Sequence, residues 1–140
     1  RRSSVTFNHF ADARHGATAT RLPDGRVLIA GGWVNSQPGG TAVIFDPQTR
    51  TTTPTGSLNF ARTDHRAVLL NDGRVLVVGG LGGTAEGPRP GVAEAETWDP
   101  GTGQWAVAGT MVMVGNVVKV GTGVSASMSS TDVTFAEMLR

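Results

Sequence analysis

The sequence contains one pattern of twenty residues twice, as ARHGATATRLPDGRVLIAGG at positions 13–32 and as ARTDHRAVLLNDGRVLVVGG at positions 61–80. The two stretches lie 48 residues apart and share an Ala-Arg start, an Asp-Gly-Arg step and a closing pair of glycines. A period of this length is typical of proteins built from repeated structural units. The repeat is therefore the first feature from which a fold is inferred.

Each copy is expected to form four short antiparallel strands. The Asp24-Gly25 and Asp72-Gly73 dipeptides each separate two apolar runs, and Asp-Gly predicts a tight hairpin because glycine accepts the positive φ of a primed turn. An aromatic-Asp-Pro step at Phe45 and again at Trp98 turns the chain after the third strand. The expected strands are 16–22, 26–30, 41–45 and 51–53 in the first copy, and 66–70, 74–78, 94–98 and about 104–108 in the second.

The aromatic-Asp-Pro steps are 53 residues apart, so the five additional residues fall between the double glycine and the third strand. A change in length at one connection marks that connection as a surface loop. We therefore expect loops at 33–40 and 81–92. The second contains a Gly-x-Gly-x-x-Ala run at 80–85, but the Gly-Pro-Arg-Pro-Gly that follows excludes the helix that a dinucleotide-binding turn requires.

Composition excludes several classes of function. The chain has 12 basic and 11 acidic residues, a formal charge of +1, so it shows no basic footprint for nucleic acid or for an acidic membrane surface. It has no cysteine, which excludes disulfides and thiolate metal sites in these residues. No apolar run approaches the roughly 20 residues of a membrane span. The compartment stays unassigned.

Taken together, these elements resemble the kelch repeat, a four-stranded blade of β-propellers. The resemblance rests on Asp-Gly before an apolar strand, the glycine pairs at Gly31-Gly32 and Gly79-Gly80, the aromatic-Asp-Pro steps, and Trp105 on the fourth strand. The first copy has Thr52 where the second has Trp105. The resemblance implies an all-β fold: a partial β-propeller of about two four-stranded kelch-like blades with flanking strands.

The same alignment predicts the organisation of the chain. Residues 1–9 are expected to end a preceding blade, 10–57 and 58–110 to form two blades, and 111–140 to form a divergent partial blade or tail. Within the tail we expect an opening strand at 117–120, a polar connection at 125–130 and a short helix at 131–139. Because propellers close with several blades, the chain is expected to be part of a longer propeller or to assemble with copies of itself.

The expected binding residues gather on one face. In a four-stranded meander, the loops between second and third strands and the links between blades emerge on the same side. The candidate residues there are Trp33, Asn35, Arg62, Asp64, His65 and Arg89, since aromatic and arginine side chains dominate binding hot spots. The alternative is structural: Trp33 packs against its blade, Arg14 and Arg62 brace neighbouring blades, and His65 has a blade-packing or hydrogen-bonding role.

The function expected from these features is binding or scaffolding, with a protein or a carbohydrate as partner and without a cofactor. His9, His15 and His65 are the only imidazoles, and their spacing suits no metal site. No catalytic residue can be named. The alternative is a fragment of a propeller enzyme, a galactose-oxidase-like oxidase or a sugar epimerase, whose catalytic residues lie outside this chain. The resemblance implies tyrosine and cysteine for the oxidase chemistry, and the chain has neither.

Overall fold

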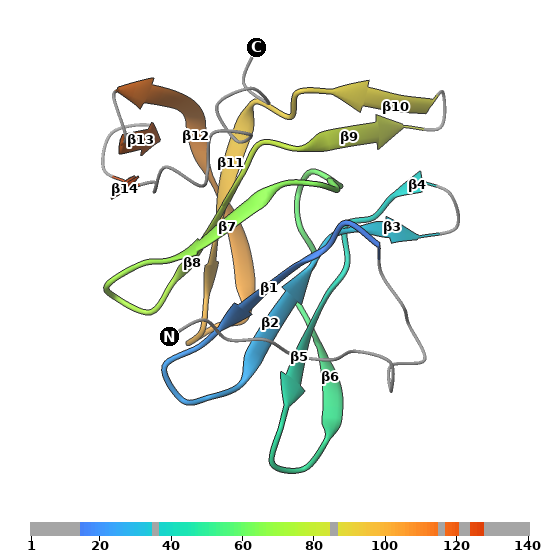
Figure 1. Cartoon of the computed structure of the whole chain (residues 1–140), viewed down its shortest axis with the longest axis vertical. Coiled ribbons are helices and arrows are strands. Elements are labelled where there is room, and N and C mark those ends of the chain that lie inside the picture. The colour runs from blue at the N-terminus through green and yellow to red at the C-terminus, as the bar shows by residue number, and fades with distance from the viewer. Residues whose placement is uncertain (1–14, 35–36, 85–86, 115–116, 121–123, 128–140) are drawn as a thin grey trace.

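The computed structural model describes residues 15–34, 37–84, 87–114, 117–120 and 124–127. Their regular structure is β-strand, and two four-stranded antiparallel units dominate the molecule (Figure 1). Blade 1 has the order β1 (Thr18–Arg21), β2 (Val27–Ala30), β5 (Ala42–Asp46) and β6 (Thr51–Thr55). Blade 2 repeats it with β7 (Arg66–Leu69), β8 (Val75–Val78), β11 (Glu94–Asp99) and β12 (Gln104–Val114). The prediction of two four-stranded blades is confirmed.

The glycines of the two Asp-Gly turns have the predicted positive φ. Each loop is one residue longer than expected. Gly25 has φ 93° and its N–H donates to the Leu22 carbonyl at 2.9 Å. The Leu22 N–H donates to the Arg26 carbonyl at 2.8 Å, so three residues, not two, separate the paired positions. Asp24 keeps a negative φ, which fits a β-turn followed by one left-handed glycine. The second copy repeats this loop, with Gly73 at φ 92°.

The core lies around the second strand of each blade. All four residues of β2 and all four of β8 are buried, which accounts for their continuous apolar sequence. Trp98 and Trp105 of blade 2 pack in the same cluster. Their indole N–H groups reach the neighbouring blade, where Trp98 donates to Thr55 Oγ1 at 3.0 Å and Trp105 donates to the Gly56 carbonyl at 2.8 Å. These aromatic side chains therefore join the blades as well as filling one of them.

The blades also meet through their first strands and through the link between them. Strand β1 lies against β7, and the Gly56 N–H donates to the Gly103 carbonyl at 2.8 Å. Thr52 of blade 1 stands at the position that Trp105 has in blade 2, and it is exposed on β6. The missing indole at this position therefore leaves no gap at the contact between the two blades.

The connections expected to be loops contain short hairpins. Strands β3 (Trp33–Val34) and β4 (Gln37–Pro38) pair within the first, and β9 (Leu81–Thr84) and β10 (Gly87–Pro90) pair within the second. The loop prediction was therefore wrong in detail, because antiparallel pairing satisfies backbone groups that an irregular loop would leave to water. Both hairpins project from the end opposite the Asp-Gly turns (Figure 1).

The C-terminal part extends the sheet of blade 2. Strand β12 runs to Val114, beyond its expected end, and pairs with β13 (Val117–Val120), which pairs with β14 (Val124–Ser127). The strand expected at 117–120 is present, but it continues the sheet of blade 2, and β14 occupies the first half of the expected polar connection. The end of a preceding blade expected at 1–9 and the helix expected at 131–139 lie outside the described residues.

The close approach at Gly80 generates a prediction about stability. Gly80 and Gly25 have nearly the same φ, 95° and 93°. A β-carbon at Gly80 would lie 2.6 Å from the Thr63 carbonyl oxygen, whereas one at Gly25 would meet nothing within 4 Å. We expect Gly25→Ala to cost about 1–2 kcal/mol from the left-handed conformation alone. Gly80→Ala should cost a further 1–3 kcal/mol or so from the clash, measured by urea unfolding. Equal losses would contradict the packing described at Gly80.

Candidate binding face

The face from which both hairpins rise is built by one repeated connection. The segment before each blade's first strand pairs with the residue that follows the double glycine, as a bridge from His15 to Trp33 and again from Thr63 to Leu81. In the second, the Thr63 N–H donates to the Leu81 carbonyl at 2.9 Å and the Leu81 N–H donates back at 2.8 Å. Strand β4 of one hairpin lies against β9 of the other. We call residues 33–34, 37–38, 81–84 and 87–90, together with Asp64, the hairpin face.

Arg62, expected as a binding residue, lies inside the molecule. Its side chain is 0% exposed, and its Nη2 donates to Glu96 Oε2 at 3.0 Å and to the Glu94 carbonyl at 2.7 Å. Nη1 donates to the Gly79 carbonyl at 3.2 Å. Burial lowers the pKa of Arg62 and the charge of Glu96 opposes that shift. Arg62 is therefore a buried structural residue, and the partners of its side chain all lie in blade 2.

Glu96 connects this arginine to the link between the blades. Its Oε1 accepts from the Asn59 backbone N–H at 2.7 Å and from the Asn59 side chain at 3.1 Å, and its Oε2 accepts from the Phe60 N–H at 2.9 Å. A buried carboxylate is stable only when hydrogen bonds and an opposite charge compensate for the loss of water. Glu96 has both, so it fixes the path of the chain from Asn59 to Arg62.

His65, another expected binding residue, is 1% exposed and lies between the blades. Its Nε2 is 2.8 Å from the Thr18 hydroxyl of blade 1. Gly31 and Gly80 approach it so closely that a β-carbon at either would lie within 3 Å of a carbon atom of His65. Burial, together with the nearby positive charges of Arg62 and Arg66, lowers the pKa of His65 to about 3. The imidazole is therefore neutral near pH 7, and its Nδ1 is buried without a partner among the described residues.

Asp64, also expected as a binding residue, is exposed. Its φ is 57°, an uncommon conformation for a residue other than glycine, and its N–H donates to the Gly16 carbonyl at 2.8 Å. The Thr63 hydroxyl donates to Asp64 Oδ2 at 3.3 Å. Gly16, one repeat earlier, also has a positive φ of 79°. The backbone contacts hold the Asp64 carboxylate at the surface.

The remaining expected residues belong to the two hairpins. Trp33 is half-buried, and its N–H donates to the His15 carbonyl at 2.7 Å. Arg89 is in β10, in register with Gly82. Asn35 lies outside the described residues. The structure thus brings Trp33, Asp64 and the backbone of Arg89 to one face and places Arg62 and His65 beneath it.

Sequence reasoning missed Glu96, although a signal for it exists. At the 53-residue spacing Glu96 replaces Val43, so a carboxylate stands where the first copy has an apolar residue. A carboxylate at such a position needs a buried partner, and Arg62 of the repeated pattern is that partner. Within the described ranges, no three histidine or acidic side chains are grouped to hold a metal ion. No helix in that part of the chain has the length and apolar character to cross a bilayer.

The comparisons with known proteins identify the fold. Over 71% of this chain, the structure resembles a novel fungal alcohol oxidase of the AA5 family, in complex with copper, with 18% sequence identity and a TM-score of 0.59. Over 75%, it resembles the structure of YjhT, also with 18% identity and a TM-score of 0.59. The chain has the kelch-propeller fold.

This kelch-propeller chain corresponds to 23% of the length of the oxidase and 43% of the length of YjhT. No family model matches the sequence, and no curated protein does. At this level of identity the likeness establishes the fold, and any activity has to be argued from the residues themselves.

The buried ion pair generates a prediction. Glu96→Gln keeps the shape of the side chain but leaves Arg62 buried without an opposite charge, so we expect a loss of about 3–5 kcal/mol in urea unfolding. The control is Asp24→Asn, which breaks the exposed pair of Asp24 with Arg26, 2.8 Å apart. Exposed pairs contribute little, so the control should barely move the unfolding midpoint. Similar midpoints for the two variants would contradict the role given to Glu96.

His65 generates a prediction about pH. Its pKa is about 3 in the folded chain and 6.5 when unfolded, so between these values the unfolded state binds the additional proton. The contribution of His65 to stability is therefore greatest above pH 6.5 and falls by about 1.4 kcal/mol per pH unit as the pH decreases towards 3. In His65→Gln, which does not titrate, the decline between pH 6.5 and 5 should be smaller. Parallel stability profiles would show that His65 does not cause the acid sensitivity.

Proposed function

We propose that this chain is a binding and scaffolding segment that engages a protein or a carbohydrate through the hairpin face. The observation that supports the proposal is the pairing of two short hairpins side by side on a base that a buried ion pair holds. Binding residues are often carried on connections that a rigid scaffold positions. Here the scaffold includes Arg62 and Glu96 beneath the face.

The hairpin face presents apolar side chains and a carboxylate, so it suits a partner that has both apolar and polar groups. Leu81 is 36% exposed, which is high for a large apolar residue, and Trp33 is half-buried. Asp64 adds an exposed carboxylate, one residue after Thr63, which pairs with Leu81. Aromatic and aliphatic anchors next to a polar group are typical of binding hot spots. A peptide segment with an apolar residue next to a basic one, or a sugar ring stacked on Trp33, would match this composition.

A second candidate follows from the likeness to a copper alcohol oxidase. In this alternative the chain forms part of a propeller enzyme, an oxidase or a sugar epimerase, whose catalytic residues lie in segments outside the 140 residues. The chain would then supply blades that position those segments. The absence of tyrosine and cysteine from these residues favours the binding role for the segment itself.

The test is selection of ligands followed by mutation of the hairpin face. The chain is screened against a displayed peptide library and an array of immobilised glycans, and the affinity of each selected ligand is measured. We expect Trp33→Ala or Leu81→Asp to weaken binding by about tenfold or more, the loss typical of a hot-spot residue. The matched control is Thr52→Ala, on the exposed outer strand β6.

A ligand that both hairpin variants bind as tightly as the unmodified chain would place binding elsewhere and overturn the proposal. Circular dichroism of each variant checks that the blades are folded. Reduced binding in a folded variant then reports on the hairpin face itself.

A further inference from the structure

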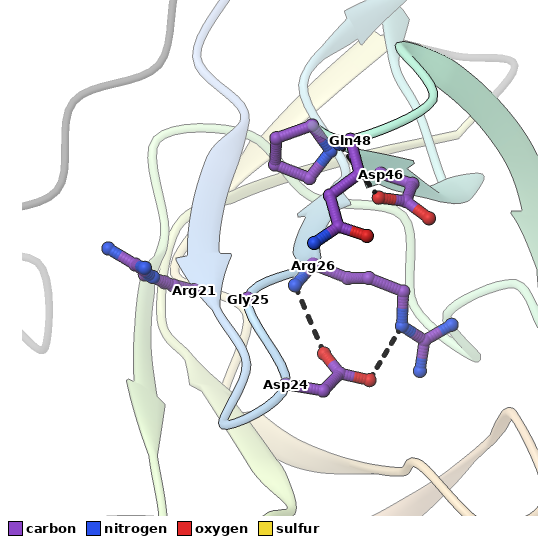
Figure 2. A pocket seen from close by; sticks show the side chains of 7 residues that line it. Arg21, Asp24, Gly25, Arg26, Asp46 and Gln48 are labelled. Atoms are coloured by element: carbon purple, nitrogen blue, oxygen red, sulfur yellow. Dashed lines mark hydrogen bonds and ion pairs between the residues drawn. The ribbon is translucent and has the colours of Figure 1, made fainter.

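The opposite end of blade 1 contains a hollow that none of the functions above uses. It has a volume of about 470 Å³ and lies between the β1–β2 turn and the β5–β6 turn. Figure 2 shows the residues that line it: Arg21, Asp24, Gly25, Arg26, Asp46, Pro47 and Gln48. Clefts of 300–1,000 Å³ or so accommodate small molecules. We call this feature the turn hollow.

The repeat provides an internal comparison for the turn hollow. Blade 2 has the same turns: Arg74 N donates to Asp72 Oδ1 at 3.0 Å, as Arg26 N does to Asp24 Oδ1. The Asp-Pro turn is repeated as well, because Asp46 Oδ1 accepts from the N–H two residues later at 3.0 Å and its counterpart in blade 2 does so at 2.8 Å. The frame of the hollow is therefore a structural property of the repeat.

Two lining residues differ between the blades. Arg21 and Gln48 of blade 1 correspond to Leu69 and Gly101 of blade 2. Blade 1 thus carries a guanidinium and a carboxamide at positions where blade 2 has an aliphatic side chain and a glycine.

The polar atoms around the turn hollow are both donors and acceptors. The Gln48 carboxamide, which lies above the Asp24–Arg26 pair in Figure 2, has no hydrogen-bond partner in the described part of the chain. Arg26 uses Nε for Asp24, at 2.8 Å, and leaves its two Nη groups available among these residues. Asp46 uses Oδ1 for its turn and leaves Oδ2 available. Three donor nitrogens, from Gln48 and Arg26, thus accompany two acceptor oxygens, from Gln48 and Asp46.

Charge balance indicates the class of ligand. The two arginines and two aspartates of the lining cancel, so an anion would meet Asp24 and Asp46, and a cation would meet Arg21 and Arg26. A hydroxyl group both donates and accepts, and suits a site that offers both functions. The Pro47 ring adds an apolar surface for C–H groups. We propose that the turn hollow binds a neutral polyhydroxylated molecule, one sugar unit in size, through Arg26, Asp46 and Gln48.

The test follows backbone amides by NMR while neutral sugars are added to the full chain. The probes are methyl α-glucoside and methyl β-galactoside, with glucuronate as the charged comparison. We expect the amides of Gly25 and Gln48 to shift saturably with at least one neutral glycoside, with a Kd of about 1 mM, the weak end of specific binding. Gly73 and Gly101, in the equivalent turns of blade 2, should not shift.

The matched variant is Gln48→Gly, which places the blade 2 residue in the blade 1 turn. It should weaken binding of the neutral glycoside by about tenfold, as expected for the loss of a carboxamide that both donates and accepts. The proposal is overturned if neither glycoside causes a saturable shift, if only glucuronate does, or if both blades respond equally. Because the turn hollow lies at the other end of the blade from the hairpin face, this result is independent of the proposed function.

Discussion

The buried contact between Arg62 and Glu96 determines how the two blades are joined. Both side chains are 0% exposed, and their charges are 3.0 Å apart. Neither could remain buried alone, since an uncompensated charge in the interior is strongly unfavourable. Glu96 also accepts hydrogen bonds from the backbone at Asn59 and Phe60. One carboxylate therefore holds the arginine and the link between the blades, and the first strand of blade 2 starts from the position this link reaches.

The two ends of the blades use the same repeated architecture differently. At the hairpin end, the link residues place His65 between the blades and Asp64 at the surface, so neighbouring residues have opposite environments. At the turn end, identical Asp-Gly-Arg and Asp-Pro turns recur in both blades, and the differences are confined to side chains such as Gln48. Residues that are the same in both blades therefore maintain the fold, and residues that differ between the blades are available for recognition.

Much of the fold could be predicted from the sequence, and less of the candidate site. Strands β2 and β8 were predictable because burial on both faces requires a continuous apolar run. The hairpins within the long connections were not, since β3 has two residues only, β9 contains two glycines, and the bridges to His15 and Thr63 form only in the folded chain. For Arg62 and His65 the sequence left a binding role and a structural role open, because arginine is mostly exposed in proteins and histidine is intermediate.

The sequence by itself determined that the chain is a repeat of two four-stranded units with an Asp-Gly turn in each. It could do so because turn chemistry and strand burial depend on neighbours close in the chain. Only the tertiary structure decided which polar side chains are buried. The partner of Arg62 lies 34 residues away at Glu96, and the partner of His65 lies 47 residues away at Thr18 in the other blade. Such contacts exist only after the blades have packed, and they set both the charge and the exposure of each group.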